Sequence, residues 1–139
     1  MDKEIYVLDA CSLIAFFNDE PGAEKVQELF QKAVNEETEI FLHAINFYEV
    51  YYDCLRVKGI DGANKLFSAI ASLPITLERD ISDKLITEAS YFKVNEKVSL
   101  ADSIMLGLAK IKDAAAVSSD HHEFDPIAIK KLVDFFWIR

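Results

Sequence analysis

Short apolar segments with the character of buried strands alternate with amphipathic helical segments along the chain, and this alternation restricts the fold more than any other feature. Residues 4–8 form such a strand segment, whereas residues 23–34 place apolar side chains at the three-and-four spacing of a helix. Strands that alternate with helices pair in parallel through right-handed crossovers. We therefore expect a three-layer α/β/α sandwich with a central, mostly parallel sheet.

Glycine, proline and capping residues set the expected boundaries of these elements. Gly59 ends one helix, Asp61 caps the next, and Pro126 opens a short helix near the C-terminus. The expected strands are residues 4–8, 39–43, 75–77, 114–118 and 132–138. The other helices are expected at residues 13–17, 23–34, 46–58, 61–73, 80–93 and 99–112.

The size and composition indicate one folded domain, residues 1–139. Hydrophobic residues make up 51% and charged residues 28%, which excludes a disordered chain. The longest apolar runs are far shorter than the ~20 residues that cross a bilayer, and the acidic N-terminus does not match a signal peptide. Cys11 and Cys54 lie far apart and do not have Cys-x-x-Cys spacing, so neither a disulfide framework nor a zinc site is indicated. Reduced thiols are therefore expected. We therefore expect a cytoplasmic protein without a membrane segment.

Four acidic residues occupy positions from which they can meet at one edge of the predicted sheet. Asp9 and Asp120 each follow a buried strand, and the carboxyl ends of parallel strands form the edge where ligands bind. Glu49 lies on a predicted helix with Asn46 three residues earlier, on the same face. Asp102 lies in the first turn of a largely apolar helix. If the strands before Asp9 and Asp120 are neighbours, both acids face one crevice.

Each acid also has a purely structural interpretation. An Asp after a strand is often a helix cap, an interpretation as strong as the functional one for Asp9 alone. Ser99 and Asp102 fit the capping-box pattern, so Asp102 alone is better explained as part of a helix N-terminus. Glu49 alone is best explained as a solvated helix residue. Only the combination of the four indicates a functional site.

A cluster of carboxylates is stabilised by a bound cation, which offsets their mutual repulsion. Two carboxylates about 5 Å apart repel each other by roughly 3 kcal/mol at an effective dielectric constant near 20. Hard ions such as Mg²⁺ and Mn²⁺ prefer oxygen ligands, and two of them can support in-line attack of water on a phosphodiester. The acids therefore predict a divalent-metal site with hydrolytic chemistry.

Four sequence segments resemble the PIN-domain ribonucleases, and especially the VapC-type toxins of toxin–antitoxin pairs. The similarity covers nearly the whole chain and depends on the order and spacing of the motifs. The segments are the opening Val7 to Glu24, the helix motif Asn46-Phe-Tyr-Glu49, Leu100-Ala-Asp-Ser103, and Ser118-Ser-Asp120.

The resemblance implies a PIN-like fold and a Mg²⁺- or Mn²⁺-dependent endoribonuclease. It also implies an RNA substrate, a homodimer, and a small antitoxin protein that blocks the site. Asn46 and Ser118 would support the site with polar groups. The implied metal ligands, which would also be the catalytic residues, are Asp9, Glu49, Asp102 and Asp120.

One position departs from the family pattern. The family commonly has Ser or Thr two residues after the first Asp, whereas this chain has Cys11 there and Ser12 one position later. We interpret Cys11 as a small buried residue beside the end of the strand. The departure concerns the surroundings of Asp9 rather than the acids themselves.

The formal net charge of −9 is unfavourable for a nuclease, because Lys and Arg supply most of the affinity for phosphates. Two divalent ions in the acid cluster would contribute +4 and change the sum from −9 to −5. An acidic surface would also suit a basic antitoxin better than RNA. We expect both effects to account for part of the excess.

Other functional classes fit the sequence less well. A catalytically silent PIN-like module for binding or dimerisation is the main alternative, although it would have little need for four mutually repelling carboxylates. A phosphoacceptor receiver would have adjacent acids after the first strand, but Ala10 follows Asp9. A haloacid-dehalogenase-like phosphatase would need Asp-x-Asp, but position 11 is Cys.

Histidine, tyrosine and basic residues give weaker signals. The histidines lack the His-x-x-x-His spacing of a helical zinc site; we expect His43 in a strand, and His121 and His122 in an exposed loop. Tyrosines beside Glu49 could stack on RNA bases, but a core or interface position is favoured. These tyrosines are Tyr48, Tyr51 and Tyr52. A modest basic patch is the best candidate for a surface that faces RNA, although a solvated helix surface is the favoured interpretation; it comprises Arg56, Lys58 and Lys65.

Overall fold

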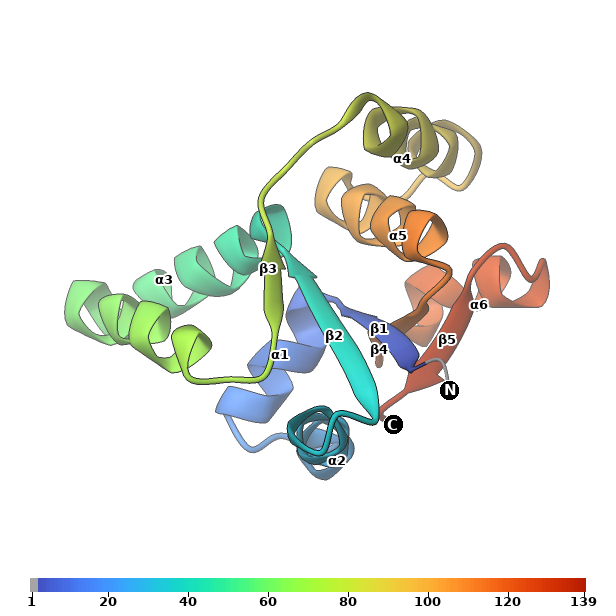
Figure 1. The fold of residues 1–139 in the computed structure, drawn as a ribbon. Helices are drawn as coiled ribbons and strands as arrows, with labels where there is room; N and C mark the ends of the chain where they lie inside the picture. Colours follow the sequence, from blue (N-terminus) through green and yellow to red (C-terminus); the bar gives the residue numbers. More distant parts are fainter. Residues whose placement is uncertain (1–2) are drawn as a thin grey trace.

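The computed structural model describes residues 3–139 and contains a five-stranded sheet in which every pair of neighbouring strands is parallel. The strand order is β3-β2-β1-β4-β5, so β1 lies at the centre (Figure 1). This confirms the predicted α/β class with its mostly parallel sheet. The strands are β1 (Glu4–Leu8), β2 (Thr38–His43), β3 (Thr76–Glu78), β4 (Ala115–Ser118) and β5 (Asp134–Trp137).

Helices cover both faces of the sheet. Side chains alternate between the faces along β1, so that Tyr6 and Leu8 pack with α1, α2 and α3, whereas Val7 packs with α4, α5 and α6. The result is the predicted three-layer sandwich with one apolar core on each side. The helices are α1 (Ala10–Phe17), α2 (Ala23–Val34), α3 (Ala44–Ala71), α4 (Asp83–Asn95), α5 (Leu100–Lys112) and α6 (His121–Ile129).

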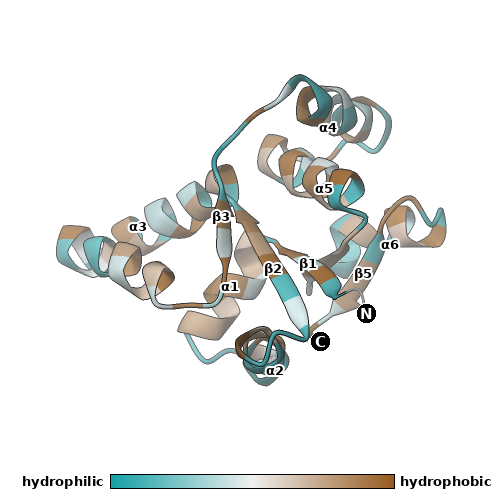
Figure 2. Cartoon of the chain, in the orientation of Figure 1, coloured by the Kyte–Doolittle hydropathy of each residue, from teal (hydrophilic) through white to brown (hydrophobic). Residues whose placement is uncertain are grey.

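Helix α5 is the most deeply embedded helix of the second layer. All residues from Ser103 to Ala109 are buried, because α4 covers one side of α5 and the sheet covers the other. Figure 2 shows the corresponding apolar colour along most of α5. Despite this apolar character, no helix within residues 3–139 is both long and apolar enough to cross a membrane.

Two predicted boundaries differ from the structure in instructive ways. The predicted helices on either side of Gly59 form the two arms of α3, and Gly59 produces the kink between them with φ 78° and ψ −178°. Pro126 does not open a helix, so that prediction is wrong. Helix α6 begins at His121 because the Asp120 side chain caps it, and Pro126 therefore lies inside the helix.

Gly107 allows α5 to approach α4 closely. A Cβ atom at this position would lie 2.9 Å from the backbone nitrogen of Ala89 and 3.2 Å from its Cβ. Such distances cannot be relieved by the movement of a flexible side chain, because the obstructing atoms belong to or adjoin the α4 backbone.

We expect Gly107→Ala to lower the free energy of unfolding by about 1–3 kcal/mol, the usual cost of overpacking a core. Alanine is more favourable than glycine inside a helix by about 1 kcal/mol. A net loss of stability in Gly107→Ala would therefore show that the steric conflict outweighs this gain. Urea denaturation followed by circular dichroism measures this change. Equal or higher stability of the variant would contradict the close approach of the two helices.

Candidate metal centre

Parallel pairing of β1 with β4 brings Asp9 and Asp120 to the same edge of the sheet. Leu8 lies opposite Val117 in the register, and the Asp9 backbone N–H donates to the Val117 carbonyl at 3.2 Å. Asp9 directly follows β1, and Asp120 follows β4 after one residue. Each aspartate caps the helix that comes next. The expected neighbourhood of these strands is therefore confirmed.

Both aspartates are helix caps, as their structural interpretation predicted. Oδ1 of Asp9 accepts a hydrogen bond from the Ser12 backbone N–H at 2.7 Å, and Oδ1 of Asp120 accepts one from Glu123 at 3.0 Å. The Ser118 hydroxyl oxygen accepts from the Asp120 backbone N–H at 3.0 Å. A carboxylate has two oxygens, so capping fixes each side chain without preventing it from binding a cation.

Glu49 on α3 and Asp102 on α5 face the same pocket as the two aspartates. The pocket has a volume of about 270 Å³ and opens to solvent. The four predicted site residues therefore meet, although they come from four different parts of the chain. The side chains that line this acid pocket are those of Asp9, Ala10, Cys11, Ile14, Glu49, Tyr52, Asp53, Arg56, Asp102 and Asp120.

Asn46 connects the two helices that carry Glu49 and Asp102. It is fully buried, and its Nδ2 donates to the Ala101 carbonyl at 3.1 Å, one residue before Asp102. Within residues 3–139, its Oδ1 atom is the one buried side-chain polar atom without a hydrogen-bond partner. A buried acceptor left unsatisfied is costly, which marks this region as one that gains from an additional donor or cation.

The pocket is an unfavourable place for negative charge. Burial raises the pKa of the Asp9 carboxyl to about 6, although hydrogen bonds from Ser118 and Ser12 oppose the shift. Burial also raises the pKa of Asp102 to about 6. The pKa of Glu49 is raised as well, first by burial and then by the charge of Asp102.

Cys11 lies beside the acids but is not the buried residue that we expected. Cys11 is exposed and lines the pocket. Partial burial of its thiol and the charges of all four acids raise its pKa to about 12. The thiol therefore stays protonated near neutral pH. Ser12 is the buried neighbour instead, and its hydroxyl donates to the Asp9 carbonyl at 3.0 Å.

The donor chemistry of the pocket fits a hard divalent cation, since the acids offer only oxygen ligands and their ionisation is hindered by burial and mutual repulsion. Over residues 3–139, no three Asp, Glu, His or Cys side chains already stand in positions that would hold a metal ion. Binding would therefore require the carboxylates to draw together.

Three lining residues of α3 were not predicted as part of the site. Tyr52, Asp53 and Arg56 follow Glu49 at helical positions i+3, i+4 and i+7 and hence share its face. We had favoured a core or interface position for Tyr52, and we had assigned no role to Asp53. The helical spacing counted from Glu49 is the signal that would have found all three.

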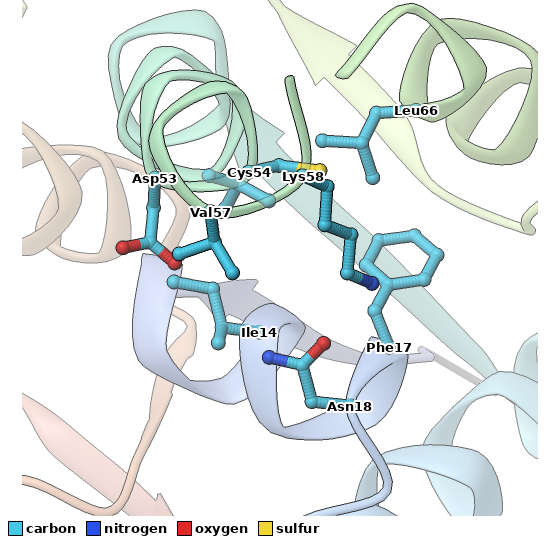
Figure 3. A pocket seen from close by; sticks show the side chains of 9 residues that line it. Ile14, Phe17, Asn18, Asp53, Cys54, Val57, Lys58 and Leu66 are labelled. Atoms are coloured by element: carbon cyan, nitrogen blue, oxygen red, sulfur yellow. The ribbon is translucent and has the colours of Figure 1, made fainter. Parts of the chain in front are cut away.

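A smaller cleft of about 60 Å³ adjoins the acid pocket between α1 and α3 (Figure 3). Ile14 and Asp53 line both cavities, so the two share a wall. In Figure 3, Ile14 and Val57 point toward one another across the cleft, and the Lys58 side chain runs along its side. The cleft is mainly apolar, in contrast to the acid pocket.

The histidines do not line the acid pocket. His43 ends β2 as predicted; its Nδ1 accepts from the Ile45 backbone N–H, and its Nε2 donates to the Asp80 carbonyl at 2.9 Å. His121 and His122 begin α6 rather than lying in a loop, so that part of the prediction is wrong, although both are exposed as expected. The His121 ring stacks on Trp137 with ring centroids 3.8 Å apart, and a hydrogen bond with Asp125 raises the pKa of His121.

A parallel α/β/α sandwich with carboxylates at the carboxyl edge of its central strands defines the class of this protein. Residues 6–130 match the family profile described as PIN domain, which is most of the 139 residues. The chain therefore belongs to the PIN domain family. The search of curated proteins found no significant match.

Solved structures with the same fold include toxin–antitoxin proteins. VapBC2 from Rickettsia felis, bound to a DNA fragment from its promoter, matches with TM-score 0.75 and 16% identity, over 96% of this chain and 98% of that chain. DNA-bound VapBC from Salmonella typhimurium matches with TM-score 0.74 and 12% identity, over 98% and 99%. VapC20 from Mycobacterium tuberculosis, described as a sarcin–ricin loop cleaving toxin, matches with TM-score 0.60 and 12% identity, over 81% and 87%. Identities this low establish the shared fold alone.

We expect Asp9→Asn to stabilise the metal-free protein at pH 7. The pKa of Asp9 in the folded protein is about 6, above its ordinary value of 3.8, so its ionisation costs folding free energy above pH 6. Asparagine also caps helices well. The expected gain is about 2 kcal/mol at pH 7 and should shrink toward zero as the pH falls from 6 to 4.

Thermal or urea unfolding in excess chelator at several pH values measures this gain. Asp83→Asn, at an exposed position in the first turn of α4, is the control and should change stability by less than about 0.5 kcal/mol. Adding Mn²⁺ should raise the melting temperature of the wild type more than that of Asp9→Asn. An equal shift in both proteins would argue against metal binding at Asp9.

Proposed function

We propose that this protein is a metal-dependent endoribonuclease that acts as the toxin of a toxin–antitoxin pair. The observation that carries the proposal is the meeting of Asp9, Glu49, Asp102 and Asp120 in one solvent-open pocket at the edge of the sheet. Membership of the PIN domain family supports the nuclease assignment. The structural similarity to VapC proteins and VapBC complexes supports the toxin assignment.

The four acids would hold Mg²⁺ or Mn²⁺. Bound ions of this kind activate a water molecule and stabilise the leaving oxygen during phosphodiester hydrolysis. Asp9 and Asp120 are fixed by the helices that they cap, whereas Glu49 and Asp102 approach from α3 and α5. The Ser118 hydrogen bond favours the ionised form of Asp9 against the effect of burial, and the hydrogen bond from Asn46 to Ala101 joins α3 to α5.

RNA is the proposed substrate, and a small antitoxin protein is the proposed partner. VapC20, with the same fold, is described as a toxin that cleaves the sarcin–ricin loop, which is RNA. Several matching structures are complexes of toxin with antitoxin. A net charge of −9 favours a basic antitoxin segment. A homodimer and a cytoplasmic location complete the proposal.

We expect the purified protein to cleave RNA only when Mg²⁺ or Mn²⁺ is present. Total RNA, incubated with the wild type and with Asp9→Asn or Asp102→Asn, provides the assay. Each variant should lose at least about 100-fold in rate, because a ligand and its charge are removed from the reacting centre. Unchanged cleavage in the variants or in excess chelator would contradict the proposal. Absence of cleavage with any metal would favour the catalytically silent binding module.

Cleavage should weaken as the pH falls through about 6. Asp9 and Asp102 both have pKa values of about 6, and each must lose its proton before it binds a cation. We therefore expect the apparent affinity for Mn²⁺ to fall steeply between pH 7 and pH 5. Isothermal titration calorimetry at several pH values measures it, and a flat profile would contradict the assignment of these two ligands.

The toxin role predicts that production of the wild type arrests bacterial growth, whereas Asp9→Asn is tolerated at the same protein level. Production together with a small protein encoded beside this gene should restore growth. Harmless overproduction of an active nuclease, together with the absence of any such neighbouring gene, would argue against a toxin.

A further inference from the structure

Helix α3 carries an exposed group of aromatic and basic side chains beside the acid pocket, and the proposed chemistry leaves this group unexplained. Tyr48 and Tyr52 are 61% and 42% exposed, large fractions for tyrosines that contact each other. Their ring centroids lie 5.1 Å apart at an interplanar angle of 72°, an edge-to-face contact. Arg56 follows one helical turn after Tyr52.

This group is continuous with the acid pocket. Tyr52 and Arg56 line the pocket together with Glu49, because positions i, i+3 and i+7 share one face of a helix. Arg56 is the one basic residue among the lining residues of the pocket. Tyr48 contacts Tyr52 from the turn before it and extends the aromatic surface away from the acids.

The Arg56 guanidinium is available to a ligand. It is paired with Asp53, but its side chain is 70% exposed. An exposed ion pair on one helix contributes little to stability, so a phosphate can replace the Asp53 carboxylate at small cost. Guanidinium groups bind phosphate oxygens through two parallel hydrogen bonds, which compensates for the pair that is lost.

We propose that Tyr48, Tyr52 and Arg56, together the aromatic–basic stripe, bind an unpaired RNA segment next to the acid pocket. The Tyr52 ring stacks on a base, Tyr48 braces that ring, and Arg56 binds a neighbouring phosphate. Exposed aromatic side chains accept unpaired bases of any sequence, whereas bases within a duplex offer no free face. This inference rests on the proposed ribonuclease function and assigns RNA-binding residues on α3 that lie beside the acids.

A protein partner is the competing occupant, since Tyr and Arg are also common in protein interfaces. Two observations favour RNA. The stripe opens directly onto the acids that would cut the chain, and Arg56 supplies positive charge where the rest of the pocket is negative. The Arg56 guanidinium offers the phosphate backbone of RNA a paired contact that the acids themselves cannot offer.

Cleavage kinetics on a labelled single-stranded RNA of mixed sequence test the role of Tyr52. We expect Tyr52→Leu to raise KM roughly tenfold with little change in kcat, since stacking supports binding rather than the chemical step. Tyr52→Phe keeps the ring and should retain a KM within about twofold of the wild type. Tyr91→Leu is the matched control, because Tyr91 is 46% exposed but lies on α4, outside the acid pocket.

Salt-dependent binding tests the role of Arg56. In the Asp9→Asn background with Mg²⁺, fluorescence anisotropy follows binding of the same RNA without cleavage. Arg56→Gln should reduce the slope of log Kd against log salt by about 0.7, the value for one phosphate contact on a single strand. Lys32→Gln removes the same charge from an exposed position on α2 and should leave the slope unchanged.

The outcomes separate this inference from the proposed function. Metal-dependent cleavage by the wild type with an unchanged KM in Tyr52→Leu would overturn the stripe alone. Equal losses by Tyr52→Leu and Tyr52→Phe would also overturn it, as would loss of dimerisation in light scattering with RNA binding intact. Failure of the wild type to bind or cleave RNA with any metal would overturn both.

Discussion

Parallel pairing of β1 with β4 is the constraint on which the rest of the structure depends. It joins two strands that are more than 100 residues apart in the sequence and places the side chains that follow them at one edge. The alternation of side chains along β1 then divides the core into two layers. One layer holds α3, which carries Glu49, and the other holds α5, which carries Asp102. The acid pocket is therefore a product of the whole sandwich rather than of any local motif.

The sheet and most of the helices could be predicted because apolar periodicity reports local structure directly. The bounds of α2 agree with the prediction at both ends, and Gly59 was recognised as the break within α3. Pro126 misled the prediction because proline favours the first turn of a helix, whereas the side-chain cap of Asp120 started α6 earlier. A cap of this kind depends on the direction in which the chain leaves β4, which periodicity does not encode.

The four acids were predicted from residue type and position, and the structure places them around one pocket; their role in metal binding remains a proposal. The exposure of Cys11 and the position of Tyr52 were not foreseen. Both depend on which way a helix turns its faces after it packs, and a hydrophobic residue at a pocket mouth has the same sequence signal as one in the core. Tertiary packing decides such cases.

The order of the acids along the chain has a consequence for biosynthesis. A chain leaves the ribosome N-terminus first, so Asp9, Glu49 and Asp102 emerge well before Asp120, which directly precedes α6. Strand β4 precedes Asp120 and pairs with β1, so Asp120 reaches the pocket only after β4 has joined the sheet. A nascent chain therefore lacks the complete acid cluster until Asp120 has left the ribosome and β4 has paired with β1.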